Sequence, residues 1–460
     1  MNGKPMVRLA LFVIAALAAL PAAGQVQVNR THTETLLAPF PPEVYDSTIL
    51  SPDGRHVAYL RESDEKQAAV LDGKAGKPYD RVAAPAFSPD GNWLAYAAAD
   101  GQQWYVVVNA REEGPYGRVG PPVFGPDSRK LAHVAMFADR ARAVVVNGKP
   151  GTQYDQIFEG LIVFSPDGTK IAYGALKADK WFLVVDDQQT GPYDFLGSAT
   201  GIRFSPDGGR VAFAALAGKQ WCVVSGGEKQ PLYENIGELV YSPDGKRMAY
   251  AALKAGKWRV VVDRKEQKPY DAVGEGSLAF SPDGSKLAYS ARSGGKWCVV
   301  LDGREGKKYE GVAEIRFSPN GQRLAYTVQT GTAEIVVLDQ QEQRIFDRVG
   351  GGTLVFSPDS RQLAYVALSG RVSCAVVDGQ RKRRYDLVGY LTFTPDGRFP
   401  VYAAIRGDKT FTVVDEKEAL HQYDAVWNVP GEKLLFDSRK KFHYLAVKEG
   451  GIYLVEEEVD

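Results

Sequence analysis

The stretch Phe280-Ser-Pro-Asp-Gly-Ser-Lys-Leu-Ala-Tyr289 decides the fold, because close copies of it recur along most of the chain. Its centre is a Ser-Pro-Asp-Gly tetrad between two apolar runs. Successive tetrads start 37 to 40 residues apart, and so narrow a spread over ten copies is the signature of a repeat architecture. The ten tetrads begin at Ser51, Ser88, Gly125, Ser165, Ser205, Ser242, Ser281, Ser318, Ser357 and Thr394.

The chemistry of the tetrad predicts a tight turn. Proline at its second position presets φ near −65°, aspartate suits the third position, and glycine takes the left-handed conformation at the fourth. Ser128 and Ser360 replace that glycine, so we expect left-handed strain at both. The tetrad lacks the alternating oxygen ligands of a calcium loop. We therefore interpret it as a structural hairpin turn.

One clean repeat contains four short apolar runs bounded by turn residues: 268–273, 277–280, 286–291 and 296–302. Four such strands make one blade of a β-propeller. None of the runs has the 3.6-residue period of a helix. The sequence thus predicts an all-β propeller of four-stranded blades with about eleven repeats, the eleventh being a worn copy near 434–444 without the tetrad.

A second recurring motif, Tyr-Asp, appears in nearly every repeat. A residue pair found in almost all blades is more typical of blade packing than of a unique site, and we expect the acid to pair with a turn or a neighbouring blade. The clear copies begin at Tyr45, Tyr79, Tyr154, Tyr193, Tyr270, Tyr385 and Tyr423.

The two ends of the array indicate how it closes. The array opens with an isolated strand motif at 42–46, and its last unit lacks that motif. An N-terminal strand that completed the last blade would remove the open sheet edges that invite aggregation. Eleven exceeds the usual four to eight blades. We favour one large closed ring, with two tandem smaller propellers as the alternative.

The pattern Phe-Ser-Pro-Asp-Gly-x-x-Leu-Ala-Tyr resembles the WD40-like (PD40) propeller repeat, over nearly all the chain from about residue 40. That repeat occurs in TolB, the tricorn protease and the N-terminal propellers of dipeptidyl peptidase IV-like enzymes. The resemblance implies a propeller fold and makes an envelope protein complex plausible. It carries over no catalytic residue, because the peptidases act through an α/β-hydrolase domain with a Gly-x-Ser-x-Gly elbow, which this sequence lacks.

The first residues are typical of a secretory signal peptide. Lys4 and Arg8 precede an apolar run over 9–20, and the small residues 22–24 suit a cleavage site. The expected organisation is a signal peptide over 1–24, a lead-in over 25–40 and the repeat array over 41–460. The mature protein would be periplasmic or secreted, with no membrane span. Lys plus Arg equal Asp plus Glu, 56 against 56, which gives no argument for nucleic acid.

No enzyme, metal or cofactor site is predicted. The five histidines, His32, His56, His133, His421 and His443, have no close metal-ligand spacing. The three cysteines, Cys222, Cys298 and Cys374, occupy matching repeat positions 76 residues apart. Equivalent positions two blades apart are too distant for a disulfide, so we expect buried free thiols.

Two candidate partner surfaces stand out. One is a basic run, Arg381, Lys382, Arg383 and Arg384, which would suit an acidic partner or phosphate, although a solvated turn explains it too. The other is a set of tryptophans that open matching strands and would form an arc near one rim. Packing between blades is the structural alternative for this arc. Its members are Trp104, Trp181, Trp221, Trp258 and Trp297.

The leading hypothesis is a non-catalytic scaffold or binding module of the cell envelope that holds protein partners. The alternative is a propeller enzyme or a small-ligand (sugar or peptide) sensor with a site in the central channel. Residues that break the repeat consensus, such as Arg203, Glu314 and Arg316, would then converge at the channel mouth. The sequence leaves the oligomeric state open.

Overall fold

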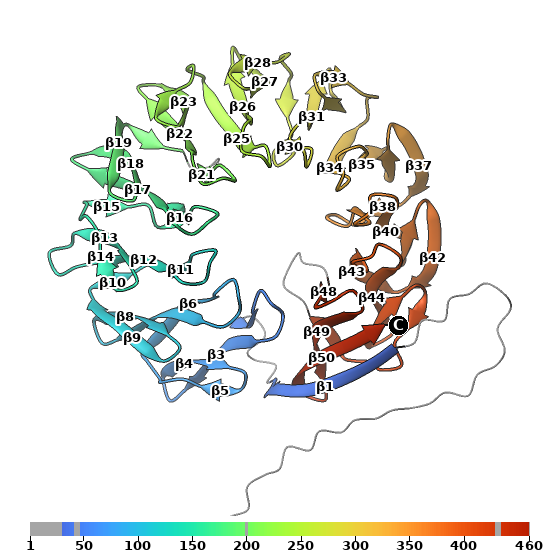
Figure 1. The fold of residues 1–460 in the computed structure, drawn as a ribbon, viewed down its shortest axis with the longest axis horizontal. Coiled ribbons are helices and arrows are strands. Elements are labelled where there is room, and N and C mark those ends of the chain that lie inside the picture. Colours follow the sequence, from blue (N-terminus) through green and yellow to red (C-terminus); the bar gives the residue numbers. More distant parts are fainter. Residues whose placement is uncertain (1–29, 41–46, 198–200, 428–433, 460) are drawn as a thin grey trace, which may run out of the picture.

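The chain forms one ring of eleven antiparallel sheets, as Figure 1 shows. The structure is a computed structural model that describes residues 30–40, 47–197, 201–427 and 434–459. The predicted fold class, an all-β propeller of about eleven blades, is confirmed, and the single ring is found instead of two smaller ones. The expected signal peptide, 1–24, lies outside the described residues.

Each sheet is one blade, and its strands run in chain order from the channel outward, except that the N-terminal β1 is the outermost strand of blade 11. Blades 1 to 4 comprise β2 (Ile49–Leu50), β3 (Val57–Ser63), β4 (Lys66–Leu71) and β5 (Lys74–Ala75); β6 (Arg81–Phe87), β7 (Leu94–Asp100), β8 (Gln103–Val108) and β9 (Arg111–Tyr116); β10 (Arg118–Val119), β11 (Val123–Phe124), β12 (Leu131–Met136), β13 (Arg142–Val146) and β14 (Lys149–Pro150); and β15 (Gln156–Ile157), β16 (Val163–Phe164), β17 (Ile171–Lys177), β18 (Lys180–Val185) and β19 (Gln188–Tyr193). A short 3-10 turn, η2 (Glu159–Leu161), lies between β15 and β16.

Blades 5 to 8 repeat this arrangement. They comprise β20 (Phe195–Leu196), β21 (Arg203–Phe204), β22 (Val211–Ala217), β23 (Gln220–Ser225) and β24 (Glu228–Lys229); β25 (Asn235–Tyr241), β26 (Met248–Lys254), β27 (Lys257–Val262) and β28 (Lys265–Glu266); β29 (Ala272–Val273), β30 (Ala279–Phe280), β31 (Leu287–Ser293), β32 (Lys296–Leu301) and β33 (Arg304–Glu305); and β34 (Gly311–Phe317), β35 (Leu324–Thr330), β36 (Ala333–Leu338) and β37 (Gln341–Phe346).

Blades 9 to 11 complete the ring, and the last of them includes the N-terminal strand. They comprise β38 (Arg348–Val349), β39 (Val355–Phe356), β40 (Leu363–Ser369), β41 (Val372–Val377) and β42 (Gln380–Tyr385); β43 (Leu387–Phe393), β44 (Pro400–Arg406), β45 (Lys409–Val414) and β46 (Lys417–Glu418); and β47 (Ala425–Trp427), β48 (Leu435–Phe436), β49 (Lys441–Lys448), β50 (Gly451–Val459) and β1 (Arg30–Pro39).

The strand assignment within one repeat differs from the prediction. The runs predicted as separate first and second strands, 268–273 and 277–280, contribute β29 and β30, which both pair with β31 at the channel-side position. The fourth strand is instead the two-residue β33, after the turn at Asp302. Sequence pattern missed it because two exposed polar residues carry no alternating apolar signal.

The tetrad forms the predicted turn between the innermost and second strands. In blade 7 the amide of Gly284 donates a 2.8 Å hydrogen bond to the carbonyl of Ser281, and Gly284 has φ of +70°. The buried Ser281 hydroxyl donates to Asp283 at 2.5 Å and accepts from the amide of Lys286 at 2.9 Å. Because this buried hydroxyl both donates and accepts a hydrogen bond, the first position of the motif favours serine for its side chain as well as for its place in a turn.

The aspartate of the Tyr-Asp motif joins two successive blades, which confirms the expected role in packing. Asp194 follows blade 4, where the ammonium of Lys180 lies 2.7 Å from its carboxylate. Its other oxygen accepts from the amide of Gly218, at the outer turn of blade 5, at 2.6 Å. These contacts hold the pKa of Asp194 below its usual value, with the Lys180 hydrogen bond as the main cause. Corresponding turn contacts are made by Asp80, Asp155, Glu234, Asp271, Glu310, Asp347, Asp386 and Asp424.

The ring closes through a strand that lies upstream of the expected one. β1 pairs antiparallel with β50 from Arg30 to Pro39, within the stretch expected to be a lead-in, whereas the motif at 42–46 lies outside the described residues. Blade 11 then contacts blade 1, where Arg55 forms a 2.8 Å ion pair with Asp437. The worn eleventh copy thus contributes to closure. Among the described residues, no helix has the length and apolar character needed to cross a bilayer.

Candidate functional site

The five tryptophans lie on the face of the ring opposite the tetrads. Each follows the outer turn between the second and third strands of its blade, and each is half-buried. Trp181 contacts Phe195 of the next blade with ring centroids 5.9 Å apart, and Phe195 contacts Trp221 at 6.3 Å. These three rings link blades 4 and 5, so packing accounts for part of the arc.

The other tryptophans contact their own blades. Trp258 lies against Gly237, where an added Cβ would come within 3.2 Å of the indole, and the guanidinium of Arg292 stacks 5.6 Å from the ring of Trp297. Trp104 differs, because its ring lines a cavity. The arc is therefore not one uniform surface, and a cavity lies beside Trp104.

The cavity beside Trp104, here called the inner pocket, has a volume of about 590 Å³. It lies between the channel-side strands of blades 2 and 3, on the tryptophan face. Because the 40-residue interval before Ser165 accommodates η2, blade 4 brings Glu159 to its edge. Its lining residues are Arg81, Ala83, Ala84, Ala97, Trp104, Arg118, Val119, Gly120, Pro121 and Glu159.

The charge of the inner pocket is carried by Arg81, Arg118 and Glu159. All three side chains are exposed, and within the described part of the chain none of them forms a hydrogen bond or ion pair. Small residues around them, including Gly120, leave the space open; an added Cβ at Gly120 would meet Glu159 at 3.3 Å. The inner pocket thus combines an aromatic wall with two free guanidinium groups.

The basic run lies on β42, the outer strand of blade 9, and two of its four cations form ion pairs. The ammonium of Lys382 lies 3.6 Å from Glu416, and Arg383 forms a 3.0 Å ion pair with Glu418, both acids belonging to blade 10. Arg381 stacks 4.7 Å from the ring of Phe346. Arg384 is exposed. Of the four consecutive cations in the sequence, Arg381 and Arg384 therefore keep charges that no acid pairs with among the described residues.

The consensus-breaking residues of the channel side form two separate pairs. Arg316 lies 3.5 Å from Glu314 on the same strand, and Arg203 is close enough to Glu238 to favour its charged form. Glu314 also accepts from the amides of Gly352 and Leu354 in blade 9, at 2.9 and 3.1 Å. Burial raises the pKa of both glutamates. These acids therefore tie neighbouring blades together.

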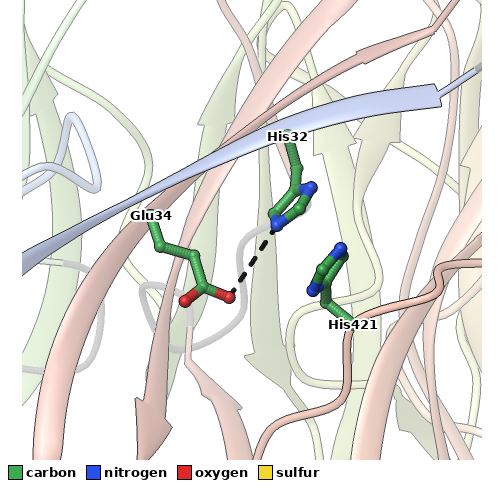
Figure 2. A group of neighbouring side chains, drawn as sticks. All are labelled: His32, Glu34 and His421. Atoms are coloured by element: carbon green, nitrogen blue, oxygen red, sulfur yellow. Dashed lines mark ion pairs between the residues drawn. The ribbon is translucent and has the colours of Figure 1, made fainter. Parts of the chain in front are cut away.

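Two histidines from opposite ends of the chain meet at the ring closure. His32 and Glu34 lie on β1, and His421 lies in the connection between β46 and β47, as Figure 2 shows. The ring centroids of the two histidines are 3.4 Å apart. Burial lowers the pKa of His32, and the nearby His421 lowers it further. The spacing of histidines along the sequence could not predict this contact, because the two residues meet only when the ring closes. A local sign of a ligand pair was the His-x-Glu sequence at His32 and Glu34.

The comparisons with known proteins give no family. No family model matches the chain, and no curated protein matches it. The solved structures that resemble it include a eukaryotic initiation factor (12% identity, TM-score 0.41, covering 81% of this chain and 97% of that one), TolB from Acinetobacter baumannii (18%, 0.25, 56% and 77%), and the β-propeller domain of the trilobed protease from Pyrococcus furiosus (14%, 0.28, 55% and 94%). Every TM-score is below 0.5, so these likenesses give no argument about function.

Proposed function

We propose that this protein is a non-catalytic binding protein of the cell envelope that holds a protein partner at the inner pocket. The supporting observation is the half-buried Trp104 beside two exposed arginines, Arg81 and Arg118, in a cavity of about 590 Å³. Tryptophan and arginine are the residue types that dominate binding energy in protein interfaces. Both residue types occur here, and among the described residues no hydrogen bond or ion pair uses the guanidinium groups of Arg81 and Arg118.

The chemistry of the inner pocket favours an acidic segment of the partner. A guanidinium group binds a carboxylate through two parallel hydrogen bonds, and two such groups line the same pocket as the indole. Both arginines are exposed, so a small ligand would keep much of its surface in water, whereas small-molecule sites bury 70–90% of their ligands. A partner's own surface would cover the rest of the site.

The second candidate function is a sensor for a small sugar or peptide. The volume of the inner pocket, about 590 Å³, falls within the ordinary range for small-molecule sites, and an indole ring offers a stacking surface. This function predicts that a soluble ligand alone fills the site. A propeller enzyme in the channel would require convergent reactive groups, whereas Glu314 and Glu238 already bind backbone amides.

The test is crosslinked capture from envelope extract with three versions of the protein. The double variant Arg81→Ala/Arg118→Ala should recover at least tenfold less partner than the wild type. Arg111→Ala is the control, because Arg111 is exposed on the outer strand of blade 2, which also carries Arg81, and it should capture as well as the wild type. Capture unchanged in the double variant would refute the inner pocket as the binding site, and no captured protein would refute the proposed function.

Export is tested separately by fractionating cells. The whole chain should appear in the envelope or medium, shortened at its N-terminus, and a chain lacking residues 1–24 should stay in the cytoplasm. The segment that motivates this expectation is the basic start followed by the apolar run over 9–20. Identical distribution of the two chains would contradict export by this segment.

A further inference from the structure

The ring closure places three potential metal ligands together. His32, Glu34 and His421 each offer one ligand atom, and these atoms lie within 4.8 Å of one another. The Nε2 atom of His32 is 4.0 Å from a carboxylate oxygen of Glu34. Ligands of a tetrahedral zinc ion at about 2.1 Å must come within roughly 3.5 Å of each other. Small side-chain rotations would bring these three groups to that spacing.

The backbone explains why two of these groups face the same way. Alternate residues of a strand point to one face, and in β1 the residues Arg30, His32 and Glu34 are half-buried while Thr31 and Thr33 are exposed. The edge strand therefore presents a His-x-Glu pair inward, toward the connection that carries His421. All three ligand residues are half-buried, so a bound ion would be partly shielded from water.

The surrounding charges permit a cation. The hydroxyl of Tyr423 donates a 2.8 Å hydrogen bond to Glu34, which fixes the carboxylate while leaving it its negative charge. The ammonium of Lys448 lies 3.4 Å from the other oxygen of Glu34 and opposes a cation there. The negative charge of the buried Glu457 acts on His32 in the opposite direction to Lys448 and favours a positive charge there. Two imidazoles and a carboxylate are a ligand set that suits zinc and related transition metals.

We propose that His32, Glu34 and His421 bind a divalent transition-metal ion, with Zn²⁺ as the best fit, and that this ion fastens the N-terminal strand to the connection between blades 10 and 11. Such an ion would join residues from both ends of the chain at the closure. A ligand that binds only the folded state stabilises that state, so metal binding and ring stability are coupled.

The direct test is calorimetric titration of untagged, EDTA-treated full-length protein with ZnCl₂. Wild type should bind one equivalent, His421→Ala should bind at least tenfold more weakly, and His56→Ala should match the wild type. His56 is the control because it lies in blade 1 beside Asp72. Circular dichroism confirms that each variant is folded. No zinc uptake by wild type, or equal uptake by His421→Ala, would overturn the proposal.

A second measurement separates ring fastening from incidental binding. Zinc should raise the unfolding temperature of wild type and of His56→Ala, and should raise that of His421→Ala and Glu34→Gln much less. Glu34→Gln keeps an acceptor for Tyr423 while it removes the charge, so it isolates the ligand role. With Co²⁺ in place of zinc, wild type should show visible absorption bands that His421→Ala lacks. An equal thermal shift in all four proteins would contradict the fastening role.

Discussion

The hydroxyl of Tyr423 donates a 2.8 Å hydrogen bond to Glu34, and this bond repeats at the ring closure a contact found between interior blades. The tyrosine of the Tyr-Asp motif, or of its Tyr-Glu variant at Tyr309, reaches the outer strand of the next blade in the same way at Tyr79–Glu112, Tyr309–Glu342 and Tyr385–Glu418, with distances of 2.6, 2.9 and 3.0 Å. β1 therefore occupies the place of an outer strand. The N-terminal strand closes the ring by supplying the partner that blade 11 lacks.

If β1 closes the ring, an aspartate introduced into this strand should destabilise the protein at one position and not at another. Ala38 is buried between blades 11 and 1, whereas Leu36 is exposed on the same strand. Ala38→Asp should destabilise the protein by roughly 3–5 kcal/mol, because it buries an unpaired charge, and Leu36→Asp should have little effect. Urea unfolding followed by tryptophan fluorescence measures both. Equal midpoints for the two variants would show that β1 does not seal the ring.

Sequence reasoning could predict the blades because the tetrad is a local signal. The turn at 281–284 depends on residues within a few positions of one another, and so does the strand that follows it. The closing strand could not be found this way: β1 carries alternating Thr, His and Glu without the Tyr-Asp motif, and its partner β50 lies at the other end of the chain. Local pattern has no access to such pairing.

The candidate site shows the same limit. Trp104 was identified as one of five equivalent tryptophans, but its distinct surroundings depend on Arg118 of the next blade and Glu159 of the blade after. Likewise the basic run over 381–384 is weakened by Glu416 and Glu418, which belong to a neighbouring blade. Composition shows the charge of a segment, whereas the packing of blades decides which charges stay free.

At Ser128, a hydrogen bond between two blades should compensate for strain in the backbone. Its φ is +59° where most tetrads have glycine, and its hydroxyl accepts a 3.0 Å hydrogen bond from the amide of Asp90 in the preceding blade. Ser360 does the same with Asn320. Ser128→Ala should cost about 1 kcal/mol, because it loses the bond and keeps the strain.

Ser128→Gly is the matched variant, because it loses the same bond but relieves a left-handed strain of about 1 kcal/mol. Its stability should therefore stay near that of the wild type. Chemical denaturation of the three proteins gives the comparison. If both variants were equally destabilised, strain at this position would be negligible.

The three cysteines should be unreactive in the folded protein. Cys222, Cys298 and Cys374 are buried and free, as predicted, and burial raises the pKa of each thiol. The thiolate is the reactive form, so a thiol reagent at pH 8 should label all three only after unfolding in urea. Rapid labelling of any thiol in native buffer would contradict the buried placement.

The buried His133 should make the folded protein less stable in mild acid. It stands where most blades have a buried tyrosine or phenylalanine, and burial lowers its pKa to about 4. The folded state therefore resists protonation that the unfolded chain accepts near pH 6.5, so stability falls as the pH drops from 6.5 toward 4. At pH 5 the loss from this group is roughly 2 kcal/mol.

His133→Phe separates this effect from other acid-sensitive groups, since phenylalanine occupies the same position at Phe213. Burial raises the pKa of the neighbouring Glu113, 3.6 Å from the imidazole, which favours the folded state in acid and opposes the histidine effect. The difference between wild type and variant is therefore the informative quantity. The variant should lose less stability than wild type between pH 7.5 and pH 5 in urea unfolding. Parallel losses in the two proteins would mean that His133 takes up a proton in the folded ring, because only a group whose pKa differs between folded and unfolded states makes stability depend on pH.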